Sequence, residues 1–475
     1  MPDNLVDEST PFRRELGLGD LVLTQILFVI GLPWVGVAAK QGPSHVVLWL
    51  LAVVFFYLPS AVVITHLNRE TPLEGGLYQW AKVGFGEVLG FMVAWNLWLF
   101  AIMNTSDIGL QVTQYVHYLL GRDSERWTGS QAVVAAVGCL MISALVALTM
   151  VGLSAGKWVH KAGGVLTLIT FAAIVALPWL HRAQGLLPEY HPLRTEMPVL
   201  SLMTLNLFGK LGFGALGGFE YVAIHAGESR EPVRAFTRSV LIAAPLIAIM
   251  FILGTSSVVA LIPRDQIDLI APIPQILAVG FRSLPFAVAV APVTILALLG
   301  IRVAQASVQF AGNSRLPMVA GWDKLLPSWF STLHRRYRTP FHSILFGGGA
   351  ALVLSLLGLV GVGRQEAFQL LWNGSAVFYA LAYVALFALP LFGRRARGVA
   401  WWLKGAAFSG LLMTLLYIAL AIVPIIAVGS RWLFAAKISG VIVVANAVGF
   451  AIVALAARRR AATASADLSR SPHAP

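Results

Sequence analysis

The stretch Ile30–Gly36, with the sequence Ile-Gly-Leu-Pro-Trp-Val-Gly, decides how the chain is organised. It lies inside the first long apolar run, Leu21–Ala39, where a membrane helix should be continuous. Proline removes a backbone donor there and clashes with the preceding turn. A broken helix persists in hydrocarbon only where protein or a wet cavity satisfies its backbone. Alone, the stretch fits either such a break or a simple kink, since glycine and proline are common in membrane helices.

The composition is that of a membrane protein. Of 475 residues, 58% are hydrophobic and 12% are charged, which excludes an ordinary soluble domain. The net charge of +13 is spread over short loops between apolar runs, so no nucleic-acid partner is expected. Cys139 is the single cysteine and the ten histidines lack metal-type spacing. We therefore expect no disulfide, no metal, no cofactor and no catalytic residues, and no enzyme activity.

Twelve apolar runs approach the length of about 20 residues that spans a bilayer. This predicts an all-α polytopic membrane protein. The runs are roughly residues 18–40, 45–67, 86–118, 130–153, 162–180, 199–227, 238–262, 284–312, 341–362, 366–392, 405–428 and 435–457.

The loop charges predict the orientation of the bundle. With the N-terminus inside, 22 Lys and Arg residues lie on the inner side and 10 on the outer side. This bias follows the positive-inside rule and predicts that both termini are cytoplasmic. We expect a multi-pass protein of the plasma membrane, of the bacterial inner-membrane type.

A second break is predicted in the sixth run, where Gly212–Glu220 contains four glycines and ends in a carboxylate. It lies five spans after the first break, an odd number, so the second set of five helices is inverted relative to the first. Paired breaks in inverted halves indicate the midplane site of a transporter. Helix N-termini there suit a carboxylate and C-termini suit a cation. We predict substrate contacts at Gly31, Leu32, Pro33, Trp34, Gly36, Asn104, Phe213, Gly214, Gly217 and Gly218.

Several motifs resemble one transporter superfamily. Thr71–Trp80 (TPLEGGLYQW) and Gly84–Trp95 resemble the P-x-x-G-G-x-Y-x-W…G-x-x-x-G-F…W signature of the amino acid–polyamine–organocation superfamily. Gly218–Arg234 is similar to its G-F-E…E-x-x-x-P-x-R motif. Ser314–Pro317 and Thr339-Pro340 are similar to its linker before span nine.

The resemblance implies a LeuT-like fold: two inverted five-helix repeats with discontinuous helices 1 and 6, then two more helices. We predict a cytoplasmic N-terminus (1–17), the repeats (18–180 and 199–392), helices 11 and 12 (405–457) and a disordered cytoplasmic tail (458–475). The resemblance also implies coupling of the substrate to a proton, an ion or a counter-substrate.

The chain departs from this family at both breaks. Pro33 and Trp34 stand where relatives usually keep small residues. Gly214 stands where some relatives have an aromatic gate, and Phe213, Phe208 or Trp34 is expected to substitute for it. A lysine that some proton-coupled relatives carry in span five has no equivalent near Thr170.

Charged residues inside spans are costly and are candidates for coupling or gating. Glu220 is expected either to bond the frayed backbone or to act on the substrate path, as a proton carrier or a contact for the amine. Lys210 is expected to face the outer vestibule or to snorkel to headgroups. Asp107 and Arg302 are expected to pair, or Arg302 to replace a bound sodium ion. Ser307 completes the set, as a polar wall residue.

We therefore expect a secondary transporter, or permease, that moves amino acids or related amines across the lipid bilayer by alternating access. A polyamine or organocation transporter is one alternative, but it needs carboxylates in the site, and only Glu220 and Asp107 are candidates. A non-transporting nutrient receptor on the same scaffold is the other.

Overall fold

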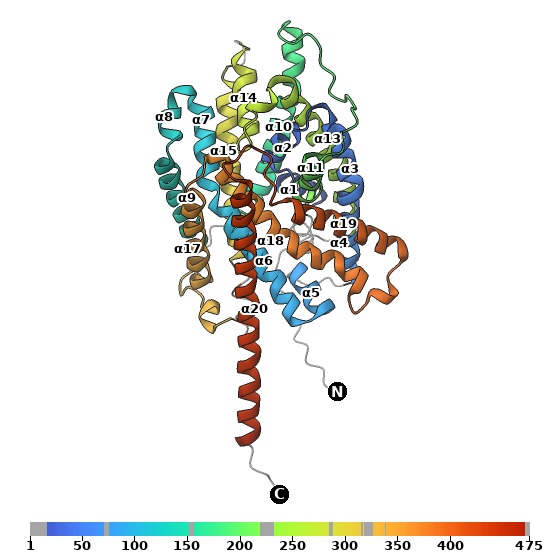
Figure 1. Ribbon diagram of the computed structural model, residues 1–475, viewed down its shortest axis with the longest axis vertical. Coiled ribbons are helices and arrows are strands. Elements are labelled where there is room, and N and C mark those ends of the chain that lie inside the picture. The colour runs from blue at the N-terminus through green and yellow to red at the C-terminus, as the bar shows by residue number, and fades with distance from the viewer. Residues whose placement is uncertain are drawn as a thin grey trace.

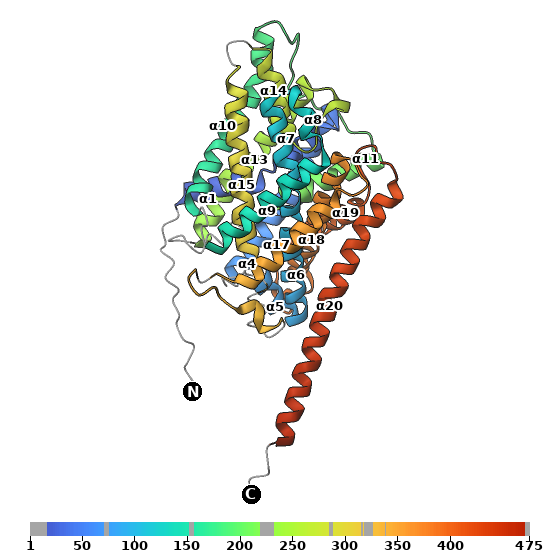
Figure 2. The same cartoon turned by 90° about the vertical axis from the view of Figure 1, so that its left-hand side faces the viewer.

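The computed structural model describes residues 17–70, 76–151, 156–218, 232–284, 288–314, 317, 326–337 and 339–470. These ranges form a helical bundle, and their one β contact is an isolated antiparallel bridge between Leu333 and Pro340. Figures 1 and 2 show α7, α8 and α14 at one end of the bundle and α5 at the other. We call these the α14 end and the α5 end.

The first part of the chain supplies helices on both sides of the first break. Their bounds are α1 Leu18–Val29, α2 Leu32–Ala39, η1 Gly42–Ser44, α3 His45–Ala52, η2 Val53–Tyr57, α4 Leu58–Glu70, α5 Leu77–Phe85, α6 Glu87–Ser106, α7 Ile108–Leu120, η3 Arg122–Ser124, α8 Glu125–Thr128, α9 Gln131–Val151 and α10 Gly156–Ala183.

The second part begins with the helix that contains the second break. Its bounds are α11 Leu202–Gly209, η4 Lys210–Gly214, α13 Pro232–Leu261, η5 Arg264–Gln266, α14 Pro272–Arg282, α15 Val290–Asn313, η7 Ser328–Ser331, α17 Phe341–Gly358, α18 Arg364–Phe392, η8 Ala396–Gly398, α19 Trp401–Leu420 and α20 Arg431–Arg470.

The predicted class, an all-α polytopic membrane protein, is confirmed. In the described ranges ten helices are long and apolar enough to cross a membrane, and α1 with α2, bent by 51°, makes an eleventh if the pair is one span. The predicted sixth span contains α11 and η4 and continues past Gly218, beyond the described residues. The count of twelve and the inverted repeat therefore stay predictions.

The bundle is built around α6 and α18, which pack along each other, while α1 lies between α10 and α13. Apolar side chains such as Leu140 on α9, Leu296 on α15 and Val443 on α20 are exposed on the outside. In water such a surface would be unfavourable, but in a bilayer it is the face that contacts lipid. The polar side chains that build the site, such as Asn104 on α6 and Arg302 on α15, lie inside the bundle.

The last helix differs from the sequence expectation. We expected residues 458–475 to be disordered, but α20 continues to Arg470 and extends past the α5 end of the bundle (Figure 2). The stretch after Ala457 is rich in Ala and Arg, which have high helix propensity. Adding residues to an existing helix also avoids the cost of nucleation.

Candidate functional site

The first break is an interruption of the backbone at Ile30 and Gly31. Both residues are extended, with φ/ψ of −78°/91° and −82°/112°, and α2 restarts at Leu32. Pro33 falls in the first turn of α2, where the missing N–H costs little and the fixed φ suits a helix. The proline therefore starts the second half of the helix rather than kinking a continuous one.

The second break has a different form. After α11 the helix widens into the π-helical turn η4, Lys210–Gly214, and ends at Leu216. Gly218 follows with φ of +128°, a conformation that favours glycine, and it donates its N–H to Tyr383 Oη at 3.1 Å. π-Helical turns inside α-helices are frequent at functional sites because the extra residue shifts the register of the side chains.

Trp34 joins the two breaks. A Cβ on Gly31 would lie 2.6 Å from Trp34 Cδ1, and a Cβ on Gly214 would lie 2.4 Å from Trp34 Cη2. The buried indole therefore lies directly on both glycines, and its ring centre is 5.6 Å from that of Trp372. Of the three residues expected to replace the aromatic gate, Trp34 is the one that packs on Gly214.

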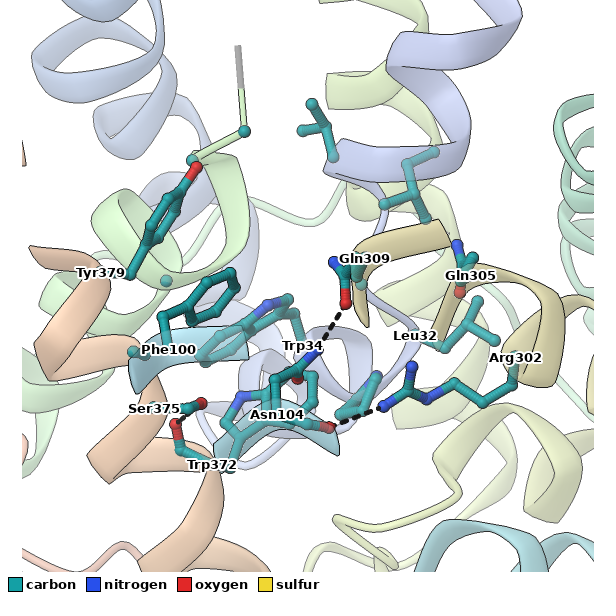
Figure 3. A pocket seen from close by; sticks show the side chains of 18 of the residues that line it. Leu32, Trp34, Phe100, Asn104, Arg302, Gln305, Gln309, Trp372, Ser375 and Tyr379 are labelled. Carbon is teal, nitrogen blue, oxygen red and sulfur yellow. Dashed lines mark hydrogen bonds between the residues drawn. The ribbon is translucent and has the colours of Figure 1, made fainter. Parts of the chain in front are cut away.

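A cavity of about 130 Å³ opens beside Trp34 at the meeting point of the two breaks. At about 10–15 Å³ per water molecule, this is room for several waters or a small solute. One wall is aromatic and is formed by Trp34, Phe100, Trp372 and Tyr379 (Figure 3), together with Phe213.

The opposite wall is polar. Asn104 on α6 donates from Nδ2 to Gln309 Oε1 on α15 at 2.6 Å. Gln305, also on α15, donates from Nε2 to the carbonyl of Leu27 at 2.7 Å. Leu27 is in the last turn of α1, whose carbonyls have no helical partner once the helix is broken. The Gln305 side chain therefore satisfies one of the groups that the first break leaves open.

Arg302 reaches the same cavity from α15, and Figure 3 shows its guanidinium beside Leu32 and Asn104. Its Nε donates to Gln111 Oε1 at 2.7 Å and its Nη2 to Asp107 Oδ1 at 3.2 Å. The predicted Asp107–Arg302 ion pair is thus present, and it is buried. Within the described residues Arg302 Nη1 has no acceptor, so this edge of the guanidinium remains available.

Lys210 takes neither orientation expected from the sequence. It is fully buried and donates from Nζ to Asn373 Oδ1 at 2.9 Å, above the ring of Tyr417 at 5.5 Å. The extra residue of the π-helical turn changes the direction in which its side chain points, and the sequence does not show that turn. Lys210 therefore ties the second break to α18 and α19.

Beyond the cavity, α2 is fixed at its far end. A Cβ on Gly36 would lie 2.7 Å from Cβ of Pro272, the first residue of α14. Lys40 Nζ donates to the carbonyl of Arg264 at 2.7 Å, and Arg264 Nε donates back to the carbonyl of Lys40 at 3.0 Å. Burial lowers the pKa of the Lys40 ammonium, and the nearby Asp265 carboxylate opposes this shift.

The α14 end is held together by Asp268. Its Oδ2 accepts hydrogen bonds from Gln114 Nε2 at 2.7 Å and Tyr118 Oη at 2.9 Å, both on α7. Its Oδ1 accepts from Gln365 Nε2 on α18 at 2.6 Å and from the backbone N–H of Ile270 at 2.8 Å. One buried carboxylate thus links helices of the first and second halves of the chain.

The structure places most of the predicted contact residues at this cavity, and their contact with substrate stays a prediction. Those that line it are Gly31, Leu32, Pro33, Trp34, Asn104, Phe213, Gly214, Gly217, Gly218 and Arg302. Gly36, Ser307, Lys210 and Asp107 do not line it, although Asp107 pairs with Arg302. Glu220 lies outside the described residues.

Among the polar lining residues that the sequence interpretation missed are Gln305 and Gln309 on α15. A signal for them exists, because Arg302, Gln305 and Gln309 follow each other at the i, i+3 and i+7 positions of one helical face. Phe100 and Tyr379 were also missed. Phe100 lies four residues before the predicted contact Asn104, on the same helical face, so the sequence held a signal for it.

Comparison with known proteins identifies the family. The amino acid permease family matches residues 16–452. An uncharacterized transporter of Legionella pneumophila is 25% identical over 387 residues, which is 80% of this chain and 81% of that protein. A probable agmatine/putrescine antiporter of Lactococcus lactis is 20% identical over 377 residues, 79% of this chain and 78% of that protein.

A polyamine transporter of Oryza sativa subsp. japonica is 23% identical over 332 residues, 69% of this chain and 58% of that protein. These relatives are named as transporters, and the match over residues 16–452 confirms the resemblance drawn from the sequence motifs. The chain belongs to the amino acid permease family.

Proposed function

We propose that the chain is a secondary transporter of amino acids that works by alternating access, with the cavity at the two breaks as its substrate site. The observation that carries this proposal is the charge of the cavity wall. Among the described lining residues Arg302 is the only ionised group, and no carboxylate is present. A buried site of this kind suits a substrate that brings its own carboxylate.

The substrate carboxylate binds between Arg302 and the start of α2. In residues 31–34, Gly31 donates its N–H to Val29 and Trp34 donates to Gly31, while Pro33 has none. Within the described chain the amide of Leu32 has no acceptor, and the Leu32 side chain lies beside Arg302 at the same cavity (Figure 3). A helix N-terminus and a guanidinium together provide donors and positive charge for a carboxylate.

The substrate ammonium faces the second break. The last helical turn there, Gly214–Leu216, presents backbone carbonyls, and the negative end of the helix dipole favours a cation. The faces of Trp34 and Tyr379 border the same space and offer cation–π contacts. The two charges of a zwitterion are thus received by opposite helix ends, as the breaks predict.

Transport in proteoliposomes tests this proposal. The full chain, reconstituted and preloaded with a mixture of unlabelled amino acids, should exchange at least one radiolabelled neutral amino acid faster than empty vesicles do. The paired substitution Asp107→Asn with Arg302→Gln removes both charges without leaving one unpaired, and it should raise KM about tenfold or more, which is about 1.4 kcal/mol of binding.

Thr294→Val is the matched control, because Thr294 lies on the exposed side of α15 and bonds only within its helix. It should leave KM unchanged. Absence of exchange for every amino acid in purified, folded protein would refute the proposal. An unchanged KM in the paired variant would remove Arg302 from the site.

A polyamine substrate is the second candidate, favoured by the names of two relatives. A diamine would have to bind beside the Arg302 guanidinium, with no carboxylate among the described lining residues. Exchange of labelled putrescine, measured in the same vesicles, separates the two candidates. We expect none above the level of empty vesicles.

A further inference from the structure

The polar wall of the cavity has more hydrogen-bonding capacity than a bare amino acid needs. Arg302, Gln305 and Gln309 form one stripe along α15, and Asn104 faces it from α6 (Figure 3). Elsewhere on α15, Val293 and Leu296 are exposed and apolar. Polar side chains inside a membrane bundle are costly, so a stripe that faces a cavity is a candidate for substrate contact.

The amide groups of Asn104 and Gln309 leave one donor and one acceptor unused. They share a single hydrogen bond, from Asn104 Nδ2 to Gln309 Oε1 at 2.6 Å, so within the described residues Asn104 Oδ1 and Gln309 Nε2 have no partner. Exchanging oxygen and nitrogen in both amides would reverse the bond and still leave one donor and one acceptor. The pair therefore presents both kinds of group side by side.

Gln305 adds a second acceptor. Its Nε2 donates to the carbonyl of Leu27, which leaves Oε1 without a partner in the described chain. The wall thus offers two amide oxygens and one amide NH₂. A carboxylate has no hydrogen to give to those oxygens, and an aliphatic side chain has neither donor nor acceptor. A carboxamide has both an NH₂ group and a carbonyl oxygen, so it can satisfy all three.

The charge at the stripe also favours a substrate with a neutral side chain. Arg302 is paired with Asp107, and in the proposed site its open edge is taken by the substrate carboxylate, so no charge is left at the stripe to balance a charged side chain. An acidic or basic side chain would be buried there without a counter-ion. A site with buried polar groups discriminates strongly against analogues that leave these groups unpaired.

From this placement we infer that Asn104, Gln305 and Gln309 form a side-chain subsite that selects neutral amino acids with a carboxamide, such as glutamine and asparagine. The inference rests on the proposed function, since it assigns the side-chain end of the same substrate. Arg302 and Leu32 bind the carboxylate of that substrate, and the subsite binds its side chain.

Asparagine and leucine are nearly the same size and differ in the carboxamide, so they are the probes. In counterflow with the full chain in proteoliposomes, asparagine should be preferred over leucine at least tenfold in kcat/KM, and glutamate and ornithine should compete poorly. Gln309→Leu should lower the asparagine-to-leucine ratio about tenfold or more, through loss of asparagine transport, while leucine transport persists. Thr294→Val should leave the ratio unchanged.

The outcomes separate the two proposals. Transport of amino acids by the wild type with leucine preferred, with glutamate as the best substrate, or with a ratio that Gln309→Leu does not change, would overturn the subsite and leave the transporter standing. Absence of all amino acid transport would overturn both. If Gln309→Leu does not fold, Gln305→Met and thermal stabilisation of the wild type by asparagine against leucine give the same test.

Discussion

Between Val29 and Leu32 the backbone leaves the helix and is extended, whereas between Gly209 and Ala215 it stays helical and only widens into a π turn. The first break thus changes the direction of the chain, by 51°, and the second changes the direction of its side chains. The first carries the large Trp34 and the second carries the glycine that receives it. The site is thus built from the large Trp34 side chain at the first break and the space over Gly214 at the second.

The two breaks also satisfy their backbone differently. At the first, Gln305 on α15 bonds the open carbonyl of Leu27. At the second, Tyr383 on α18 accepts the N–H of Gly218. In hydrocarbon these groups would be costly if unpaired, so each break depends on a side chain from another helix. The breaks are therefore held by opposite walls of the cavity, and movement of either wall disturbs one break more than the other.

The largest effect is expected from removing the Trp34 side chain. Trp34→Ala should destabilise the folded protein by about 3–5 kcal/mol, the usual loss for a buried aromatic, because the indole lies on both breaks. The thermal midpoint of the purified protein should fall, and the widened cavity should accept bulkier substrates in a competition assay. Trp432, which is exposed at the start of α20, is the control, and Trp432→Ala should change little. Equal effects of the two substitutions would contradict the comparison.

Filling the space over Gly214 is expected to have the next largest effect. Gly214→Val should cost about 1–3 kcal/mol through overpacking against Trp34. In the background of Trp34→Ala the same substitution should cost less, with a coupling of about 0.5–3 kcal/mol in a double-mutant cycle read by thermal midpoint and transport rate. Gly300→Val is the control, since nothing lies within 4 Å of its Cβ position. Strict additivity would show that Trp34 and Gly214 act separately.

The smallest effect is expected from removing the buried charge of Lys210, for which the first break has no counterpart in the described chain. Asn373→Leu removes the acceptor of a buried ammonium and should cost about 1.5–3 kcal/mol. Lys210→Met keeps much of the volume without the charge, so its stability should stay close to that of the wild type. Thermal midpoints of the two variants decide this. A greater loss of stability in Lys210→Met than in Asn373→Leu would mean that the charge itself stabilises the break.

Much of the architecture is readable from the sequence because it depends on local properties. Apolar length predicts the membrane-spanning helices. The clustered glycines and Pro33 predict the positions of both breaks, since these residues act on their own turn of helix. The Asp107–Arg302 pair follows because two opposite charges in a membrane bundle must find each other.

The other features of the site depend on how each helix is rotated about its own axis, and the local sequence pattern does not determine this rotation. The π turn adds one residue to a helical turn without any signature in the sequence, so the inward direction of Lys210 was not predictable. The contact between Trp34 and Gly214 joins residues from different halves of the chain. The stripe of α15 could have been found, because its i, i+3, i+7 spacing was present in the sequence throughout.

The buried carboxylate of Asp268 bears on the proposed alternating access. A conformation that moves α7 away from α18 at the α14 end has to separate Asp268 from Gln114 and Tyr118 on α7 or from Gln365 on α18. Each such charged hydrogen bond is worth about 1.5–3 kcal/mol before water replaces it. Moving a two-state equilibrium from 1:99 to 99:1 takes about 5.5 kcal/mol. A few hydrogen bonds to Asp268 are therefore enough to decide which of the two conformations predominates without substrate. A bound solute shifts this equilibrium only if it binds the other conformation more tightly by a comparable free energy.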